Sequence, residues 1–198
     1  MFVTFEGIDG SGKTTQVALL QETLAAQGRE VVATREPGGT ALGEGIRELV
    51  LHGVDMTPWA EACLYAAARA ELVQEVIVPA LDRGAVVISD RYVDSSLAYQ
   101  GTARWLGLDR VLELNLNAVS GLLPERTFLI AIDAVTAAER VATSKLDRIE
   151  REGLGFMRRV EEAYRELAAI FAQRIVVLDG AKPPEELAAE VRGHLGLS

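Results

Sequence analysis

Residues 7–14 of the sequence read GIDGSGKT, which fits the spacing G-x-x-x-x-G-K-[ST] of a loop that wraps its backbone amides around phosphate. The glycines allow positive φ angles and a close approach to phosphate oxygens. Lys13 can reach the β and γ phosphates of a nucleoside triphosphate, and the Thr14 hydroxyl can bind Mg²⁺. We therefore expect a triphosphate site formed by Gly7, Ile8, Asp9, Gly10, Ser11, Gly12, Lys13, Thr14 and Thr15.

Asp9 does not fit a plain anion cradle, because it is a carboxylate among amides that face negative charge. An unpaired carboxylate facing a triphosphate opposes binding. We therefore expect the Asp9 side chain to turn away from the cradle and to pair with a cation.

Three strand-like runs end in an aspartate, namely Asp90, Asp133 and Asp179. Phosphate-loop proteins hold Mg²⁺ with one such carboxylate, usually through water. Asp90 is the preferred candidate, because Arg91 follows it directly and can bridge two bound phosphates. For Asp133 and Asp179 we favour a helix cap or a turn at the end of the strand.

Arginines stand at places where ligands bind in α/β proteins. Arg35 and Arg91 directly follow predicted strands, at the edge of the sheet that forms such sites. Arg69 lies in a largely apolar helical run, so its charge is expected to face a cleft. Tyr65 lies four residues before Arg69 on the same helical face. An aromatic ring beside a guanidinium suits a base together with a phosphate, and core packing is the alternative for Tyr65.

Residues 137–153, AAERVATSKLDRIEREG, are polar and charged and follow the fourth strand-like run. One interpretation is an exposed helix pair with ion pairs between residues four apart. The other is a lid that brings Lys145 and Arg148 onto the transferring phosphate. SKLD at 144–147 only partly matches the guanine-binding motif [NT]-K-x-D, and no D-x-x-G follows the third strand-like run, which excludes a GTPase.

The pattern of apolar residues in the sequence indicates the strands and helices that position these residues. Five short runs are rich in β-branched residues and do not alternate with polar ones, which is typical of strands buried on both faces. They span 1–5, 30–34, 85–89, 127–132 and 175–178, with helical patterns between them. Strands that alternate with helices predict a parallel sheet with helices on both faces. We expect residues 1–198 to form one α/β domain, with 137–153 as its lid segment.

Composition excludes several kinds of partner. The 198 residues carry a formal net charge of −9, and an acidic surface repels nucleic acid and anionic membranes. No apolar run reaches the roughly 18 residues of a membrane span, and the N-terminus lacks the layout of a secretory signal. The single cysteine, Cys63, rules out an internal disulfide, fits a reducing cytoplasm and is predicted to be a small core residue.

Several stretches together resemble the thymidylate kinases, a family of phosphate-loop nucleoside monophosphate kinases. They are FEGIDGSGKTTQ, TREPGGT, YAAAR, VVISDRYVDSSLAYQG and LDRIE, and they occur in family order over nearly the whole chain. The resemblance implies a P-loop NTP hydrolase-type three-layer fold, whose five-stranded parallel sheet has the order 2-3-1-4-5. It also implies transfer of the γ-phosphate of ATP to dTMP, giving dTDP for dTTP synthesis, with Mg²⁺ and usually as a homodimer.

The resemblance also assigns roles at the phosphate and the sugar of dTMP. Arg47, Arg69 and Arg91 would clamp the phosphate. Asp9 would accept a hydrogen bond from the sugar 3′-hydroxyl and pair with a clamp arginine. Tyr99 would lie against the deoxyribose, where a ribose 2′-hydroxyl would be crowded out.

At the base, the resemblance implies that the ring of Tyr65 stacks on thymine. Ser96 and Gln100 would face the base edge. Glu36 would lie near the acceptor pocket and could meet the transferring phosphate through Mg²⁺ or water.

The acceptor phosphate is already a nucleophile, so catalysis is expected to rest on positioning and charge neutralisation. The expected catalytic residues are Lys13, Asp90, Arg91 and Arg148. Some family members carry an arginine in the loop where this chain has Gly10, and others place basic residues in the lid. Arg148, helped by Lys145 or Arg140, is therefore expected to supply this charge. Two alternatives stay open: a kinase for another nucleoside monophosphate or a deoxynucleoside, and a non-enzymatic nucleotide switch.

Overall fold

The computed structural model describes residues 1–141 and 146–197. Within this part of the chain, five strands form one parallel sheet in the order β2-β3-β1-β4-β5, which confirms the predicted architecture. Each predicted strand lies within one residue of the observed bounds. The strands are β1 Phe2–Glu6, β2 Val31–Arg35, β3 Val86–Asp90, β4 Arg126–Ala131 and β5 Ile175–Asp179.

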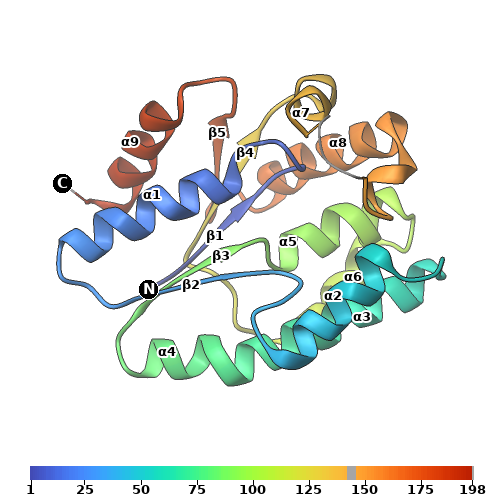
Figure 1. Cartoon of the computed structure of the whole chain (residues 1–198), viewed down its shortest axis with the longest axis horizontal. Coiled ribbons are helices and arrows are strands. Elements are labelled where there is room, and N and C mark those ends of the chain that lie inside the picture. The colour runs from blue at the N-terminus through green and yellow to red at the C-terminus, as the bar shows by residue number, and fades with distance from the viewer. Residues whose placement is uncertain (142–145, 198) are drawn as a thin grey trace.

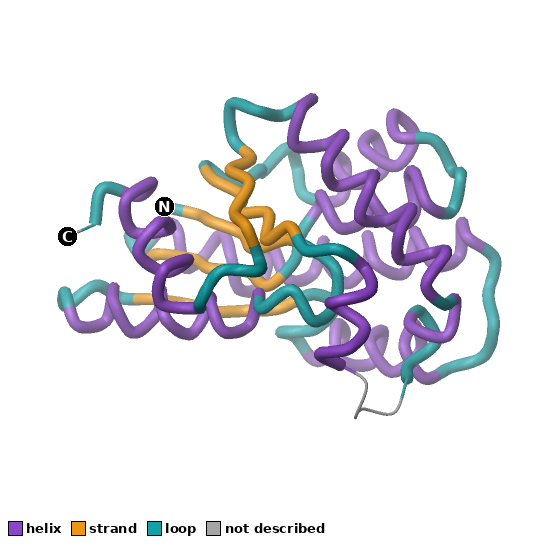
Figure 2. The backbone as a smooth tube through the Cα atoms, turned by 90° about the horizontal axis from the view of Figure 1, so that it is seen from above, coloured by secondary structure: helices purple, strands orange, loops and turns teal. Residues whose placement is uncertain are grey.

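Helices connect the strands and extend well beyond the sheet (Figure 2). The Thr40 hydroxyl accepts a hydrogen bond from the amide of Gly43 and so caps α2. Thr57 caps α3 in the same way, and Pro58 occupies the first turn of α3, where proline is tolerated. The described helices are α1 Lys13–Ala26, α2 Ala41–His52, α3 Pro58–Leu72, η1 Val73–Ile77, α4 Val78–Asp82, α5 Val93–Ser96, η2 Leu97–Ala103, α6 Leu108–Ala118, α7 Ala134–Val141, η3 Glu150–Glu152, α8 Leu154–Ile170 and α9 Pro184–Leu195.

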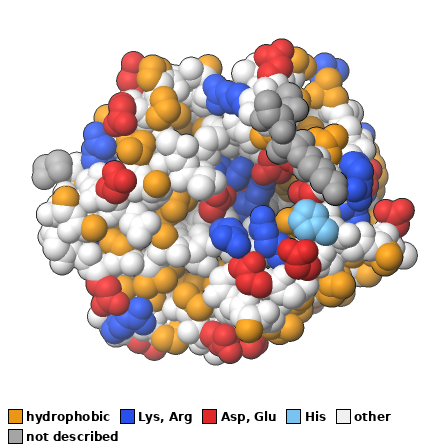
Figure 3. Space-filling model, viewed as in Figure 1, with side chains coloured by type: hydrophobic (Ala, Val, Ile, Leu, Met, Phe, Trp, Pro, Cys, Tyr) orange, Lys and Arg blue, Asp and Glu red, His pale blue; other side chains and the backbone are white. Residues whose placement is uncertain are grey.

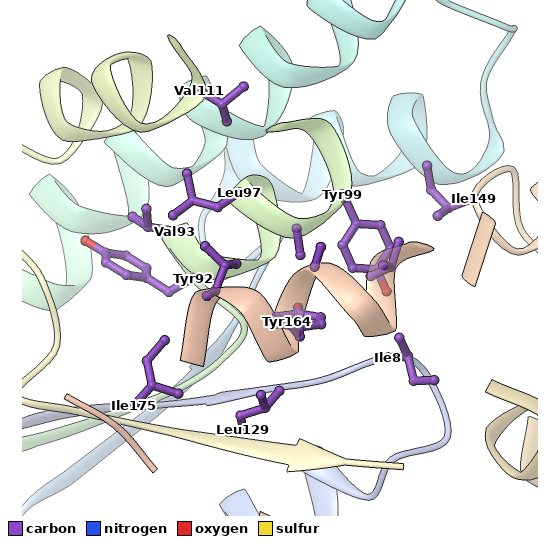
Figure 4. Packing of buried hydrophobic residues seen from close by; sticks show 14 of the residues in the cluster. Ile8, Tyr92, Val93, Leu97, Tyr99, Val111, Leu129, Ile149, Tyr164 and Ile175 are labelled. Carbon is purple, nitrogen blue, oxygen red and sulfur yellow. The ribbon is translucent and has the colours of Figure 1, made fainter. Parts of the chain in front are cut away.

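The sheet separates two hydrophobic cores, because neighbouring residues of a strand face opposite sides. On one face, α1 and α9 lie side by side (Figure 1). The core on this face includes Val3 of β1 and Leu20 of α1. The other face carries the larger core, which includes Phe2 of β1 and Leu129 of β4 and is completed by helices such as η2, α6 and α8 (Figure 4). The result is the three-layer arrangement expected from the sequence.

The prediction that all strands are buried on both faces is wrong at the two edges of the sheet. The central strands β1, β3 and β4 are almost entirely buried, whereas β2 and β5 are partly exposed. Val177 of β5 is 54% exposed. An edge strand has a neighbour on one side only, so the flanking helices cover it incompletely.

Cys63 is exposed on α3, so its prediction as a core residue is wrong. The buried face of α3 includes Ala62, Ala66 and Arg69, which recur at helical spacing. Because small apolar residues lie on both faces of α3, the sequence alone does not show the helical spacing of the buried ones. Among the described helices, none is long and apolar enough to cross a membrane.

Candidate active site

The phosphate loop, residues 7–12, connects β1 to α1 and has the strand–loop–helix context that its motif requires. Gly10 and Gly12 have φ angles of 84° and 100°, which glycine adopts without strain. Gly12 precedes the first turn of α1, whose free amides and helix dipole favour a bound anion.

Asp9 pairs with Arg91, as predicted, and also with Lys13. The Arg91 Nη2 donates to Asp9 Oδ1 at 2.6 Å, and the Lys13 Nζ lies 3.7 Å from the same oxygen. Burial acts to raise the pKa of Asp9, but the positive charges of Arg91 and Lys13 outweigh it and lower this pKa to about 2. Burial and the charge of Arg91 lower the pKa of Lys13. Lys13 Nζ also donates to the carbonyl of Ile8 at 2.9 Å.

Arg91 stands directly after β3, which lies between β2 and β1, and so stands at the carboxyl edge of the sheet. Its φ of 74° lies in the left-handed region, an uncommon conformation for a residue with a side chain. The Arg91 Nη1 donates to Ser95 Oγ at 3.1 Å and to the Tyr164 hydroxyl at 3.4 Å. The guanidinium lies 5.3 Å from the centre of the Tyr99 ring. These partners hold the guanidinium in one place before any ligand binds.

Thr14 and Asp90 form a pair of hard oxygen ligands next to the phosphate loop. The Thr14 hydroxyl donates to Asp90 Oδ2 at 2.7 Å. The described residues contain no cluster of three or more His, Cys, Asp or Glu that could hold a metal by themselves. A hydroxyl and one carboxylate fit Mg²⁺ that takes its remaining ligands from phosphate and water.

The other two strand-end aspartates have the structural roles that the sequence favoured. Asp133 Oδ1 accepts hydrogen bonds from the amides of Val135 and Thr136 at 3.1 and 3.0 Å and so caps α7. Asp179 Oδ1 accepts from the amide of Ala181 at 3.0 Å, in the turn after β5.

Two cavities meet at the carboxyl edge of the sheet. The phosphate-loop cavity has a volume of about 360 Å³ and is lined by residues such as Lys13, Thr14, Thr15 and Asp90. The tyrosine cavity has a volume of about 320 Å³ and is lined by residues such as Tyr65, Ser96, Tyr99 and Gln100. Lysine and arginine side chains gather in the hollow on this face, with acidic side chains beside them (Figure 3). The residues that line both cavities are Asp9, Gly10, Glu36, Arg47 and Arg91.

The tyrosine cavity has walls from several separate segments. Tyr65 comes from α3, Gln100 from η2 and Leu51 from α2. Ile149 comes from the segment between α7 and α8. Arg47 of α2 donates to the carbonyl of Pro37 at 3.0 Å, which holds its guanidinium at the wall that the two cavities share.

Arg69 lies behind the tyrosine cavity, which corrects the expectation that its charge faces a cleft. Its side chain is 1% exposed and forms an ion pair with Glu36. Its other donors engage Ser96 Oγ, the side-chain oxygen of Asn115 and the carbonyl of Tyr92. Burial raises the pKa of Glu36, and the charge of Arg69 opposes that rise. In this arrangement Arg69 supports Glu36 instead of presenting a free clamp.

Arg148 is also engaged within the protein. It is 6% exposed, its Nη2 donates to Glu61 Oε2 at 2.6 Å, and its Nε donates to the carbonyl of Val50 at 2.8 Å. Arg148 lines neither cavity, so the structure does not bring it to the phosphate loop as expected. Lys145 lies outside the described residues.

Among the described cations of the predicted lid segment, Arg140 contacts the phosphate loop. Its Nη1 donates to the carbonyl of Gly10 at 3.3 Å, and its Nη2 donates to the carbonyl of Gly180 at 3.2 Å. Helix α7 lies directly against Gly10, so closely that a Cβ on Gly10 would collide with the carbonyl of Ala137. The start of the predicted lid segment therefore packs on the phosphate loop.

The sequence reasoning missed two buried carboxylates at the site. Glu6 ends β1, and Glu61 lies one turn before Tyr65 on α3; both are at most 1% exposed. The signal for Glu6 was a charge at the end of an apolar strand, directly before the phosphate loop. The signal for Glu61 was an acid in an alanine-rich helix.

Comparisons with known proteins agree with this geometry. The sequence model of the family described as thymidylate kinase matches residues 5–191. A thymidylate kinase of Leifsonia xyli subsp. xyli is 53% identical over 198 residues, which cover 98% of this chain and 94% of that protein. A thymidylate kinase of Synechococcus sp. is 51% identical over 192 residues, covering 96% and 93%. The crystal structure of thymidylate kinase from Ehrlichia chaffeensis matches with a TM-score of 0.81 at 34% identity, over 98% of both chains. This chain therefore belongs to the thymidylate kinase family.

Proposed function

We propose that this protein transfers the γ-phosphate of ATP to dTMP and so produces dTDP. The observation that carries the proposal is the wall that the two cavities share. Two nucleotides bound one in each cavity would bring their phosphates together at Arg47 and Arg91, which neutralise their mutual repulsion. The family membership supports ATP as donor and dTMP as acceptor.

On the donor side, the backbone amides of residues 7–15 and the helix dipole of α1 hold the triphosphate. Lys13 binds the β and γ phosphates. Thr14 and Asp90 are the residues that hold Mg²⁺, which when bound neutralises charge on the phosphates.

On the acceptor side, Tyr65 stacks on thymine while Ser96 and Gln100 face the base edge. Tyr99 lies against the deoxyribose, and Asp9 accepts from the 3′-hydroxyl. These roles are supported by the fact that all five residues line the tyrosine cavity.

Glu36 faces both substrates. One oxygen of its carboxylate binds Arg69, and the other, Oε1, is buried without a hydrogen-bond partner in the described part of the chain. A buried acceptor without a partner is costly, which favours a ligand or water at this point of the shared wall. We assign Glu36 the role of receiving such a donor near the transferring phosphate.

The lid segment 137–153 supplies further positive charge in this proposal. Arg140 is favoured over Arg148 as the lid cation nearest the phosphates, because Arg140 already contacts the phosphate loop. Arg148 is kept in its ion pair with Glu61, where it supports the tyrosine cavity.

We further propose that the protein is a cytoplasmic homodimer. Support for the dimer comes from Leu42 and Leu49, which lie seven residues apart on α2 and are 51% and 53% exposed. Sedimentation of the wild-type protein and of Leu49→Glu tests this, since the variant is expected to sediment as a monomer.

The experiment that tests the function is an acceptor panel with ATP and Mg²⁺. ADP formation is measured with dTMP, dUMP, dCMP, thymidine or no acceptor. We expect ADP formation to depend on the acceptor and to be fastest with dTMP. Equal ATP consumption without an acceptor, or a faster reaction with another acceptor, would contradict the proposal.

A further inference from the structure

Glu61 is a buried carboxylate that joins three walls of the tyrosine cavity. It lies on α3, one turn before Tyr65. Its Oε1 accepts hydrogen bonds from Gln100 Nε2 at 2.9 Å and from Arg104 Nε at 3.2 Å. Its Oε2 accepts from Arg104 Nη2 at 3.1 Å and from Arg148 Nη2 at 2.6 Å. The walls formed by α3, by η2 and by the segment around Arg148 therefore depend on one carboxylate.

The bond to Gln100 fixes which end of its amide faces the base. Each oxygen of Glu61 also accepts from an arginine, which can only donate, so both oxygens act as hydrogen-bond acceptors. The Gln100 amino group must therefore point to Glu61, which leaves the Gln100 carbonyl oxygen at the other end of the amide. The described residues donate no hydrogen bond to this oxygen. Gln100 itself lines the tyrosine cavity.

A nucleobase whose edge faces the Gln100 carbonyl oxygen must supply the hydrogen-bond donor itself. Thymine and uracil carry an N3–H, whereas N3 of cytosine has a lone pair and repels an acceptor. Without Glu61, the terminal amide of Gln100 could rotate by half a turn at little cost and present its amino group. A Gln100 amide that is free to rotate could bind either the N3–H of thymine and uracil or the N3 lone pair of cytosine.

We propose that Glu61 is a specificity-determining positioning residue, which orients the Gln100 amide so that the cavity selects pyrimidines that carry an N3–H. The proposal rests on the acceptor pocket of the proposed function, in which Gln100 faces the base. It adds a residue that touches no substrate and acts through Gln100.

Glu61→Gln tests the proposal with little change in shape. The new amide can donate as well as accept, so it no longer dictates the orientation of Gln100. We measure kcat/KM for dTMP, dUMP and dCMP. The values for dTMP and dUMP should fall by the same factor, about tenfold or more, which is the cost of losing one buried hydrogen bond. The value for dCMP should change little, so the preference for dTMP over dCMP shrinks about tenfold while the preference over dUMP is unchanged.

Glu152→Gln is the matched control. Glu152 accepts from the Nη1 of the same Arg104 at 2.6 Å, but it is 36% exposed and does not contact Gln100. This variant should leave both preferences within about threefold of the wild type. If kcat/KM of Glu61→Gln falls by one common factor for all three acceptors, the role of Glu61 is purely structural and the proposal is overturned.

Two further measurements keep the outcome decisive. If Glu61→Gln does not fold, the wild-type protein is assayed with dTMP methylated at N3, which should react at least tenfold more slowly than dTMP; equal rates would overturn the proposal. A wild-type protein that does not phosphorylate dTMP would instead refute the proposed function. These two failures are therefore distinguishable.

Discussion

The pH dependence of folding stability offers a direct test of the buried carboxylate Glu6. Glu6 is completely buried at the end of β1. Its Oε1 accepts from the amides of Tyr92 and Ser95 at 2.7 and 3.3 Å. Its Oε2 accepts from the Ser95 and Tyr164 hydroxyls at 2.6 and 2.8 Å. These two hydroxyls in turn accept from Arg91, so one hydroxyl connects Glu6 to the Arg91 guanidinium.

Burial, and then the negative charge of Asp94, raise the pKa of Glu6 from 4.5 to about 7, although the hydrogen bonds and the charge of Arg91 act in the opposite direction. The folded protein therefore binds this proton more tightly than the unfolded chain does. The stability that Glu6 contributes by this route is fully present below pH 4.5 and is lost as the pH rises through 7. At 1.36 kcal/mol per pKa unit, the shift corresponds to about 3 kcal/mol.

Glu6→Gln removes this titration and keeps the side-chain shape. We measure the free energy of unfolding of both proteins by urea denaturation from pH 5 to pH 8. The wild-type value minus the variant value should fall by about 2 to 3 kcal/mol over this range. Titrating groups that do not interact with Glu6 are common to both proteins and cancel, and the low pKa of Asp9, about 2, lies outside the window.

Glu22→Gln serves as the control, because Glu22 is exposed on α1 and lies outside the buried cluster. Its stability curve should run parallel to that of the wild type. If the Glu6→Gln curve is also parallel, or if the wild type gains stability over Glu6→Gln as the pH rises, then the hydrogen bonds outweigh burial and the reasoning is refuted.

Three further predictions concern catalysis. Arg91→Ala should lower turnover about 100-fold, the scale of losing one transition-state donor, and near-normal turnover in a steady-state assay would contradict the bridging role. Asp90→Asn should raise the Mg²⁺ concentration at half-maximal activity about tenfold, as measured by Mg²⁺ titration; an unchanged requirement would remove Asp90 from the metal site. Arg140→Ala should lower kcat with little effect on the KM for dTMP, whereas Arg148→Ala should mainly raise that KM, because Arg148 supports the tyrosine cavity through Glu61. The opposite pattern in the two variants would restore the lid role to Arg148.

Features set by local sequence were predictable here. The strands were found to within one residue, because three of the five are buried on both faces and all five are short and rich in β-branched residues. The phosphate loop was recognised from its spacing, and Asp90 was preferred to Asp133 and Asp179 because a cation follows it. The Thr14 hydroxyl does contact Asp90, although these residues are 76 positions apart in the chain, and the choice of Asp90 as the metal-binding carboxylate stays a prediction.

Features set by long-range pairing were not predictable in the same way. Arg69 and Arg148 were expected at the phosphates because the family resemblance assigned Arg69 to the phosphate clamp and Arg148 to the lid segment. The sequence did not reveal that the nearest anions are carboxylates of the protein itself, since Glu36 and Glu61 lie 33 and 87 residues away from their partners. Glu36 lines the tyrosine cavity, and Glu61 holds Gln100, which also lines it. Each arginine therefore supports a carboxylate at or behind this cavity. We therefore infer that the buried ion pairs hold the groups of the site in position, and that the residues on the shared wall contact the reacting phosphates.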